Sequence, residues 1–276
     1  MQRIPAPDIL FAAAYRCIYC GADRYASDSA RPLADEHIVP FGLNGNLILP
    51  RASCRQCERT TGRFESLLLR GALLGCRTHL GLRTRNPKDR PKKLPLFIPT
   101  ETPNRKVMVA IEDYPTSLLL LHLGTPHRFT GQTLETGHAR AWFRLFRQDF
   151  AVLKRKYGIG EFAAPSLDAL ALSQTLAKIA HAYATAKLGS GEFTPVLLPF
   201  LRGEEDEKRF HYVGGSLDDC PASDSLHEID LRSCKHGDDD CLLVRIRLFA
   251  YLGAPLYWVF AGLLKPGHRL QPQALW

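Results

Sequence analysis

The sequence predicts an α+β fold, in which a small N-terminal unit rich in paired cysteines precedes a mixed α+β domain with an antiparallel sheet. Two Cys-x-x-Cys pairs lie in the first quarter of the chain. Short apolar segments bounded by proline or glycine follow residue 95 and are typical of strands. One longer segment, residues 166–189, has apolar side chains at helical spacing. Strands and helices in separate runs are typical of α+β proteins.

Length and composition limit the class of protein. The chain has 276 residues, of which 45% are hydrophobic, so it can form one large core or two smaller ones. Its apolar runs stay short of the ~20 residues that span a bilayer. The N-terminal run Ile9–Ala14 is followed by Arg16 rather than by the cleavage site of an export signal. We therefore expect a cytoplasmic protein with no membrane partner, whose thiols stay reduced.

Four of the eight cysteines have metal-binding spacing: Cys17 with Cys20, and Cys54 with Cys57. Two residues between thiolates let a tight turn point both sulfurs at one ion, and two such turns complete a tetrahedral zinc site. The 33 residues between the pairs exceed the usual zinc-ribbon spacing, so we expect a folded insert between them. A redox motif or coincidence is the alternative for either pair alone. The other cysteines lack such spacing and are expected to be ordinary core or surface residues: Cys76, Cys220, Cys234 and Cys241.

Positive charge is concentrated at the N-terminus. Residues 1–93 contain 16 Lys and Arg, 13 of them Arg, against 8 Asp and Glu, whereas residues 94–276 contain 20 of each sign. The whole net charge of +8 therefore comes from the first third of the chain. Arginine suits forked contact with phosphate, and concentrated positive charge attracts polyanions. The charge predicts a nucleic-acid partner, with a solubilising surface as the alternative.

Proline content and apolar pattern predict the domain boundaries. The segment LRTRNPKDRPKKLP, residues 82–95, has three prolines and few apolar residues, which indicates a basic linker. It separates an N-terminal domain, 1–81, from an α+β domain, 96–276. The role of this second domain is open among target recognition, self-association as a homo-oligomer, and binding of a partner protein.

Four elements are expected in the second domain. Residues 106–113 and 117–124 read as strands. Residues 242–264 alternate apolar residues with Arg245 and Arg247 and turn at 253–255, which predicts a hairpin with one solvent-facing side. Residues 166–189 predict a capped amphipathic helix packed on a core, with an apolar stripe of Leu172, Leu176, Ile179 and Tyr183.

The N-terminal motifs together resemble the HNH endonuclease family, whose fold is the ββα-metal finger. The resemblance covers about residues 15–70 and rests on CIYCG, DEHIVP, GNLILP and CRQC in that order. It implies a strand ending in Glu36-His37, a turn, a second strand near Leu47–Leu49, and a helix starting around Ser53-Cys54. Zinc bound by the two cysteine pairs would stabilise a unit too short to form its own core.

The resemblance also implies catalytic roles. His37 would be the general base, Glu36 a ligand of Mg²⁺ or Mn²⁺, and Asn46 the residue that orients the base. The chemistry of these residue types agrees, because imidazole titrates near neutrality and carboxylate oxygen suits hard divalent cations. A purely structural histidine is the alternative for His37, and Asn44 is expected to be a turn residue.

One position departs from the family pattern. Many relatives carry His or Asn directly after the last zinc-binding cysteine as the second metal ligand, and here that residue is Glu58. Glu65, two helical turns later, is the competing candidate. Arg55, Arg59 and Arg63 recur every four residues and suit contact with a phosphate backbone, although a solvated helix face explains them too.

These observations lead to one expected function and two alternatives. We expect a metal-dependent HNH endonuclease that hydrolyses phosphodiester bonds, with DNA as the expected substrate. The first alternative is a catalytically inactive, zinc-stabilised nucleic-acid-binding module, and the second is a purely structural protein.

Overall fold

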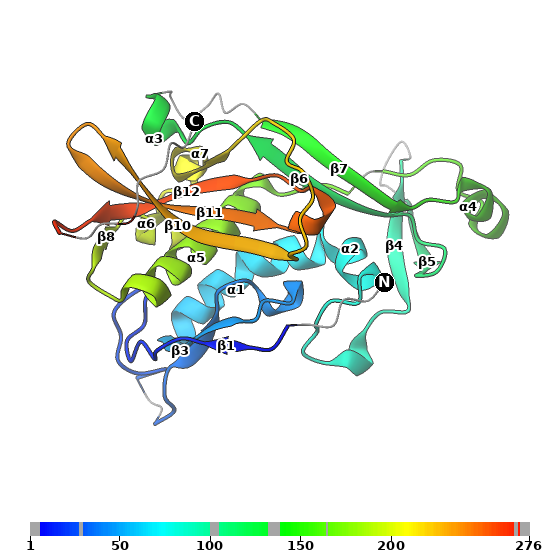
Figure 1. The fold of residues 1–276 in the computed structure, drawn as a ribbon. Helices are drawn as coiled ribbons and strands as arrows, with labels where there is room; N and C mark the ends of the chain where they lie inside the picture. Colours follow the sequence, from blue (N-terminus) through cyan, green and yellow to red (C-terminus); the bar gives the residue numbers. More distant parts are fainter. Residues whose placement is uncertain are drawn as a thin grey trace.

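The computed structural model describes residues 6–27, 30–99, 105–131, 139–163, 165–267 and 270. It confirms the predicted α+β class, because helices and strands are both abundant and nearly all of the strand pairs in this part of the chain are antiparallel. In Figure 1 the N-terminal unit lies below the long helix α5 (Ala169–Leu188), and the main sheet lies above that helix.

The N-terminal unit has the strand–turn–strand–helix order that the resemblance implies. β2 (Ala34–His37) ends on the predicted histidine and pairs antiparallel with β3 (Leu47–Ser53). β1 (Ile9–Leu10) pairs with the other edge of β3 in parallel. Helix α1 (Arg55–Arg70) begins directly after β3, with Cys54 at its N-cap. The second cysteine pair therefore lies on the first turn of a helix.

A connection over residues 38–46 joins β2 to β3. It contains the short 3₁₀ helix η1 (Phe41–Leu43), and Asn44 ends that helix in the left-handed region at φ 63°. Asn44 is thus a turn residue, as the sequence predicts. The next residue, Gly45, approaches the backbone of Val39 so closely that a Cβ there would lie 2.0 Å from the Val39 carbonyl oxygen. Only glycine fits this position.

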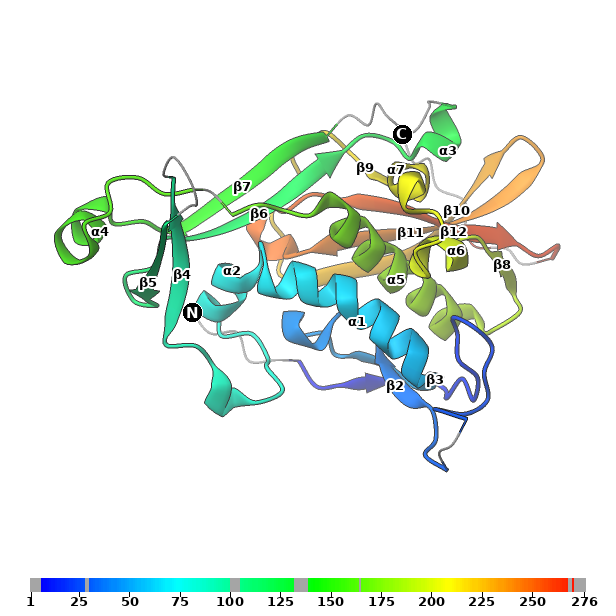
Figure 2. The same cartoon turned by 180° about the vertical axis from the view of Figure 1, so that it is seen from behind.

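Helix α5 lies at the centre of the molecule. Asp168 caps it by accepting a hydrogen bond from the Ala171 backbone N–H at 3.0 Å. Residues 171–185 are all buried, so the prediction of an amphipathic helix is wrong. The reason is that α1 packs on one side of α5 while the main sheet packs on another, as Figure 2 shows from behind. A helix covered in this way has no solvent-facing stripe.

The main sheet has five strands, in the order β10-β11-β12-β8 with β9 also paired to β12. Its strands are β8 (Phe193–Pro195), β9 (Val213–Gly215), β10 (His227–His236), β11 (Asp239–Leu248) and β12 (Tyr257–Leu264).

The predicted hairpin is confirmed, because β11 and β12 pair antiparallel around the short 3₁₀ helix η4 (Ala250–Leu252). The prediction of a solvent-facing side is wrong at Arg247, which is 5% exposed. Its guanidinium donates to the carbonyl oxygens of Ala254, Cys220 and Pro221. A neighbouring segment therefore covers this face and satisfies the arginine's donors.

The remaining elements connect and flank these layers. The predicted strands at 106–113 and 117–124 correspond to β5 (Arg105–Ala110) and β6 (Thr116–Leu123). The helices are α2 (Leu74–His79), η2 (Pro87–Asp89), α3 (His127–Thr130), α4 (Phe150–Tyr157), α6 (Leu198–Leu201), η3 (Asp206–Lys208) and α7 (Arg209–Tyr212). The strands are β4 (Lys93–Ile98), β5 (Arg105–Ala110), β6 (Thr116–Leu123) and β7 (Ala139–Arg147), which form the hairpins β4-β5 and β6-β7.

One main hydrophobic core runs through both of the predicted domains. It includes residues of the N-terminal unit such as Leu68 as well as residues of α5 and the main sheet such as Leu176 and Val244. A small second core lies under the β4-β5 hairpin and α4, the part that projects to the right in Figure 1. The division of the chain at residues 82–95 stays a prediction.

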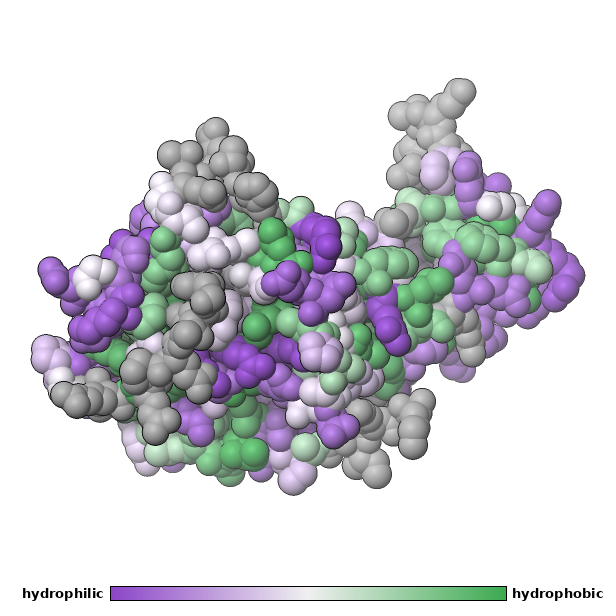
Figure 3. All heavy atoms as spheres, turned by 45° about the horizontal axis from the view of Figure 1, so that its top comes forward, coloured by the Kyte–Doolittle hydropathy of each residue, from purple (hydrophilic) through white to green (hydrophobic). Residues whose placement is uncertain are grey.

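The projecting part also carries exposed apolar side chains. In Figure 3 apolar residues, coloured green, gather on it, and Phe97, Met108 and Phe150 are each about half exposed there. Among the helices of the described residues, none combines the length and the apolar character required to cross a bilayer.

Candidate functional site

The four predicted cysteines come together in space. The sulfur atoms of Cys17, Cys20, Cys54 and Cys57 all lie within 4.8 Å of one another, and Cys20 Sγ lies 3.6 Å from Cys54 Sγ. A tetrahedral zinc ion with Zn–S bonds of about 2.3 Å places its sulfurs about 3.8 Å apart. The cluster therefore has the donor type and spacing to hold a metal such as zinc.

Local backbone structure prepares each pair of cysteines. After the first pair, Gly21 adopts φ 78° and its N–H donates to the Cys17 carbonyl oxygen at 2.8 Å, which closes a tight turn. In the second pair, Cys54 caps α1 and Cys57 lies on its first turn, where the helix dipole favours thiolates. A hydrogen bond from the Cys57 thiol lowers the pKa of Cys17 and raises the pKa of Cys57 itself.

A cleft of about 560 Å³ lies beside α1. Its lining comes from Tyr25, from β2 and the turn after it, from one face of α1, and from α2 and the chain that follows it. Helix α5 contributes a single residue to this lining, Lys178. The acidic lining residues are Asp35, Glu36, Glu58 and Glu65, and the basic ones are Arg55, Arg59, Arg70, Arg77, Arg85 and Lys178.

Glu36 and Glu65 share one cation inside this cleft. The ammonium Nζ of Lys178 lies 2.5 Å from Glu36 Oε1 and 2.9 Å from Glu65 Oε1. Burial raises the pKa of Glu36 even beside this cation. Burial favours a lower pKa for Lys178, but the two carboxylates outweigh it and raise the pKa of the ammonium. A buried lysine therefore stays charged because it is paired.

Tyr19 links the acidic pair to the cysteine cluster. It lies between Cys17 and Cys20 in the sequence and is 2% exposed. Its burial and then the negative charges of Glu36 and Glu65 raise the pKa of its phenol. The first cysteine pair and the base of the cleft are thus parts of one packed unit.

His37, the predicted base, is partly buried at the end of β2 and lines the cleft. Its ring packs edge-on against Phe41, with 5.3 Å between ring centroids. Within the described residues its Nδ1 is buried and has no hydrogen-bond partner. Burial and the nearby Lys178 charge lower the pKa of His37. The imidazole is therefore neutral at neutral pH and able to accept a proton.

The two candidates for a second metal ligand lie in different surroundings. Glu65 meets Glu36 at the same ammonium. Glu58 also lines the cleft, but its Oε2 accepts a hydrogen bond from the Tyr25 hydroxyl at 2.8 Å. The geometry groups Glu65, and not Glu58, with Glu36.

Asn46 lies apart from the residue that it is predicted to orient. Its Nδ2 donates to the Pro7 carbonyl oxygen at 2.9 Å, and it lines a different hollow, near Tyr183 and His227. The structure therefore does not bring the Asn46 amide to the cleft of His37.

Only two of the three arginines predicted to contact phosphate lie at the cleft. Arg55 and Arg59 line the cleft, whereas Arg63 lies on the same helix outside it. The sequence pattern missed three arginines that also line the cleft, Arg70, Arg77 and Arg85. Arg77 is held in place, because it donates to the carbonyl oxygens of Gly42 and Arg83. Arg85 belongs to the predicted linker, so this basic segment forms part of the cleft wall.

Lys178 is a residue of the cleft that the sequence did not single out. It follows Ala177 and precedes Ile179 in a helix of mainly apolar side chains. A lone lysine in the middle of such a helix indicates a buried ion pair, because burial of an unpaired charge is very costly. The sequence does not reveal its partners, since they lie in the N-terminal unit.

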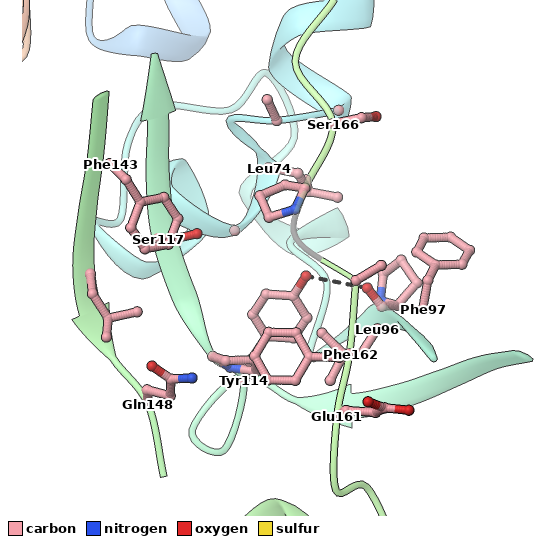
Figure 4. A pocket seen from close by; sticks show the side chains of 18 of the residues that line it. Leu74, Leu96, Phe97, Tyr114, Ser117, Phe143, Gln148, Glu161, Phe162 and Ser166 are labelled. Carbon is pink, nitrogen blue, oxygen red and sulfur yellow. Dashed lines mark hydrogen bonds between the residues drawn. The ribbon is translucent and has the colours of Figure 1, made fainter. Parts of the chain in front are cut away.

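A second hollow, of about 730 Å³, lies at the base of the projecting part. Its lining is mostly apolar and includes Leu74, Phe143 and Phe162 (Figure 4). The Tyr114 hydroxyl that faces it donates to the Pro95 carbonyl oxygen at 3.2 Å. Charged side chains among its described lining residues are limited to Arg70 and Glu161. It lacks the acid–base cluster that the first cleft has.

Comparisons of the chain with models of protein families, with curated proteins and with solved structures find no match. The resemblance to HNH endonucleases therefore rests on the motif residues and on their arrangement. The finding that stands without this resemblance is the four-cysteine cluster, which can hold a metal such as zinc.

Proposed function

We propose that this chain is a metal-dependent HNH-type endonuclease that hydrolyses phosphodiester bonds in DNA. The observation that carries the proposal is the meeting of His37, Glu36 and Glu65 in one cleft with an arginine-rich lining. Phosphodiester hydrolysis needs a base for the attacking water, a cation to offset charge, and groups that hold the phosphates. The cleft has residues suited to all three tasks.

In this proposal His37 accepts the proton of the attacking water. Its pKa lies below the ordinary imidazole value, so the neutral form predominates at neutral pH. Its Nδ1 is buried and has no hydrogen-bond partner among the described groups, so Nε2 is the nitrogen proposed to meet the water. Phe41 packs against the ring and limits its rotation.

Glu36 and Glu65 are proposed as the carboxylates that hold the catalytic Mg²⁺ or Mn²⁺. Their hard oxygens suit either ion, and Glu65 replaces Glu58 as our candidate because it meets Glu36 at Lys178. A divalent cation bound there would offset negative charge on the phosphate and on the leaving oxygen. The Lys178 ammonium already contacts both carboxylates, so it would compete with a divalent cation for the same oxygen atoms.

Exposed arginines are proposed to position the DNA. Arg55, Arg59 and Arg85 are exposed at the cleft and offer forked donors to successive phosphates. The four cysteines would hold structural zinc, which fixes the start of α1 and thereby the spacing of its arginines.

Incubation of supercoiled plasmid with Mg²⁺ or Mn²⁺ tests the proposal. The native protein should nick the plasmid, and His37→Ala should lower the rate by at least about 100-fold, since general-base catalysis contributes that much. His211→Ala is a matched control, because His211 lies on α7 outside the cleft. Equal nicking by native protein and His37→Ala would count against His37 as the base.

One observation favours the alternative of an inactive nucleic-acid-binding module. The Lys178 ammonium already neutralises part of the charge that would attract a divalent cation. In that case no metal would support nicking, while the protein would still retain DNA in a salt-sensitive manner. Absence of DNA retention at low salt would contradict both readings.

A further inference from the structure

Four oxygen atoms surround the Lys178 ammonium. Besides the two carboxylate oxygens, its Nζ contacts the backbone carbonyl oxygens of His37, by a very short bond, and of Ile38, at 3.4 Å. Carboxylate and carbonyl oxygens are the ligands that hard divalent cations prefer. The protein thus builds an oxygen cage of the kind that holds a metal ion and fills it with its own ammonium.

The charge of this cage disfavours a divalent cation while the ammonium is present. Glu36 and Glu65 carry two negative charges and Lys178 carries one positive charge, so the group has a net charge of −1. The side chain of Lys178 is 2% exposed and that of Glu36 8%, so water screens their interactions poorly. A divalent cation added beside the ammonium would meet strong like-charge repulsion, whereas the pair without the ammonium would offer its carboxylate oxygens without that repulsion.

We propose that Lys178 is the resident cation of this cage and that it competes with a divalent cation for the Glu36–Glu65 pair. Tight metal binding then requires the ammonium to leave the carboxylates. Because Lys178 comes from α5, the central helix controls access to a site on the N-terminal unit. The inference rests on the proposed function for the choice of these carboxylates as metal ligands, but it concerns metal binding and not cleavage.

Mn²⁺ binding to the full-length, zinc-loaded protein, followed by electron paramagnetic resonance, tests the competition directly. Lys178→Met keeps an unbranched side chain, one atom shorter than that of lysine, and removes its charge. We expect this variant to bind Mn²⁺ at least about tenfold more tightly than the native protein, because a like charge has been removed. Lys178→Arg keeps the charge and should bind as weakly as the native protein.

Two further variants show where the ion binds. Lys187→Met is the matched control, since Lys187 lies on the last turn of the same helix and packs over the rings of Phe11 and Tyr183. It should leave Mn²⁺ affinity unchanged. The double variant Lys178→Met, Glu65→Gln should lose the gained affinity. A folded Lys178→Met variant that binds Mn²⁺ no better than the native protein would overturn the proposal.

A crystal structure of the native protein soaked in Mn²⁺ keeps the proposal testable if Lys178→Met does not fold. Either the pair holds no Mn²⁺ and Lys178 remains in place, or Mn²⁺ is bound and Lys178 has moved away; both agree with the competition. An ion bound to Glu36 and Glu65 with the ammonium still on both carboxylates would refute it. The plasmid assay tests the proposed function separately. If neither the native protein nor Lys178→Met nicks plasmid, but Lys178→Met gains Mn²⁺ affinity, the proposed function fails and the competition stands.

Discussion

The Tyr25 hydroxyl donates a hydrogen bond to Glu58 Oε2 at 2.8 Å, and this contact sets Glu58 apart from the acidic pair at Lys178. Tyr25 lies in the segment between the two cysteine pairs, and its carbonyl oxygen accepts from the first N–H of α1, that of Arg55. The carboxylate of Glu58 raises the pKa of the Tyr25 phenol. Glu58 thus helps to hold the inserted segment against the start of α1.

Substitution of the two glutamates should separate their roles. We expect Glu65→Gln to weaken the Mg²⁺ dependence of cleavage and to lower turnover by about 10- to 100-fold, since a neutral amide is a poorer ligand for a hard cation. Glu58→Gln should stay within about threefold of native turnover, because the glutamine amide oxygen can still accept the hydrogen bond from the Tyr25 hydroxyl. Cleavage rates titrated against Mg²⁺ measure both effects. A larger loss in Glu58→Gln than in Glu65→Gln would reverse the assignment.

We expect each chain to bind one zinc ion at the four-cysteine cluster. Cys54→Ser removes one sulfur ligand but keeps a residue suited to the N-cap of α1, so any destabilisation comes from the metal site. We expect loss of the zinc and unfolding of the N-terminal unit. Metal analysis of the purified protein and thermal unfolding followed by circular dichroism measure these changes. Cys220→Ser is the control, since Cys220 lies outside the cluster and is partly exposed. Full zinc content in Cys54→Ser would contradict the prediction.

Arginines of α1 should contribute unequally to DNA binding. Arg55→Ala and Arg59→Ala each remove a phosphate contact at the cleft, so each should reduce the slope of log affinity against log salt by about 1. Arg63→Ala has the same chemistry on the same helix but lies outside the cleft, and its slope should match that of the native protein. Fluorescence anisotropy with a labelled duplex at several salt concentrations gives the slopes. Equal effects of all three variants would indicate that the whole helix face contacts DNA.

His227 should make the fold sensitive to acid. Its Nδ1 accepts from the Phe249 backbone N–H at 3.3 Å, so the ring proton is on Nε2, which donates to the Leu43 carbonyl oxygen at 2.7 Å. Burial lowers its pKa to about 4. Above pH 6.5 the imidazole is neutral in both the folded and the unfolded state, and stability is complete. As the pH falls from about 6.5 to 4, the unfolded state binds the proton first, and stability is lost.

Urea unfolding at pH 7 and pH 5 measures this loss. The native protein should lose about 2 kcal/mol of unfolding free energy at His227 between these values. His227→Gln offers one donor and one acceptor at any pH, so its free energy should change by about 2 kcal/mol less. Any release of zinc in acid affects both proteins and cancels in the comparison. An identical pH dependence in the two proteins would contradict the role of His227.

The sequence by itself determined the features that depend on local spacing. Two residues between Cys17 and Cys20, and between Cys54 and Cys57, are enough to predict a metal cluster, because a tight turn and a first helical turn each bring two sulfurs together. The β11-β12 hairpin follows from apolar pattern and turn residues. The strand that ends at His37 is what the resemblance of the N-terminal motifs implies. These features need no knowledge of what packs against them.

Only the tertiary structure decided the partners of buried charges. The pairing of Lys178 with Glu36 and Glu65, the covered guanidinium of Arg247 and the burial of α5 on all sides were not visible in the sequence. Each depends on residues far apart along the chain that meet when α1 and the main sheet pack on α5. A side chain's charge is read from the sequence, but its surroundings are fixed by long-range packing, which local periodicity does not encode.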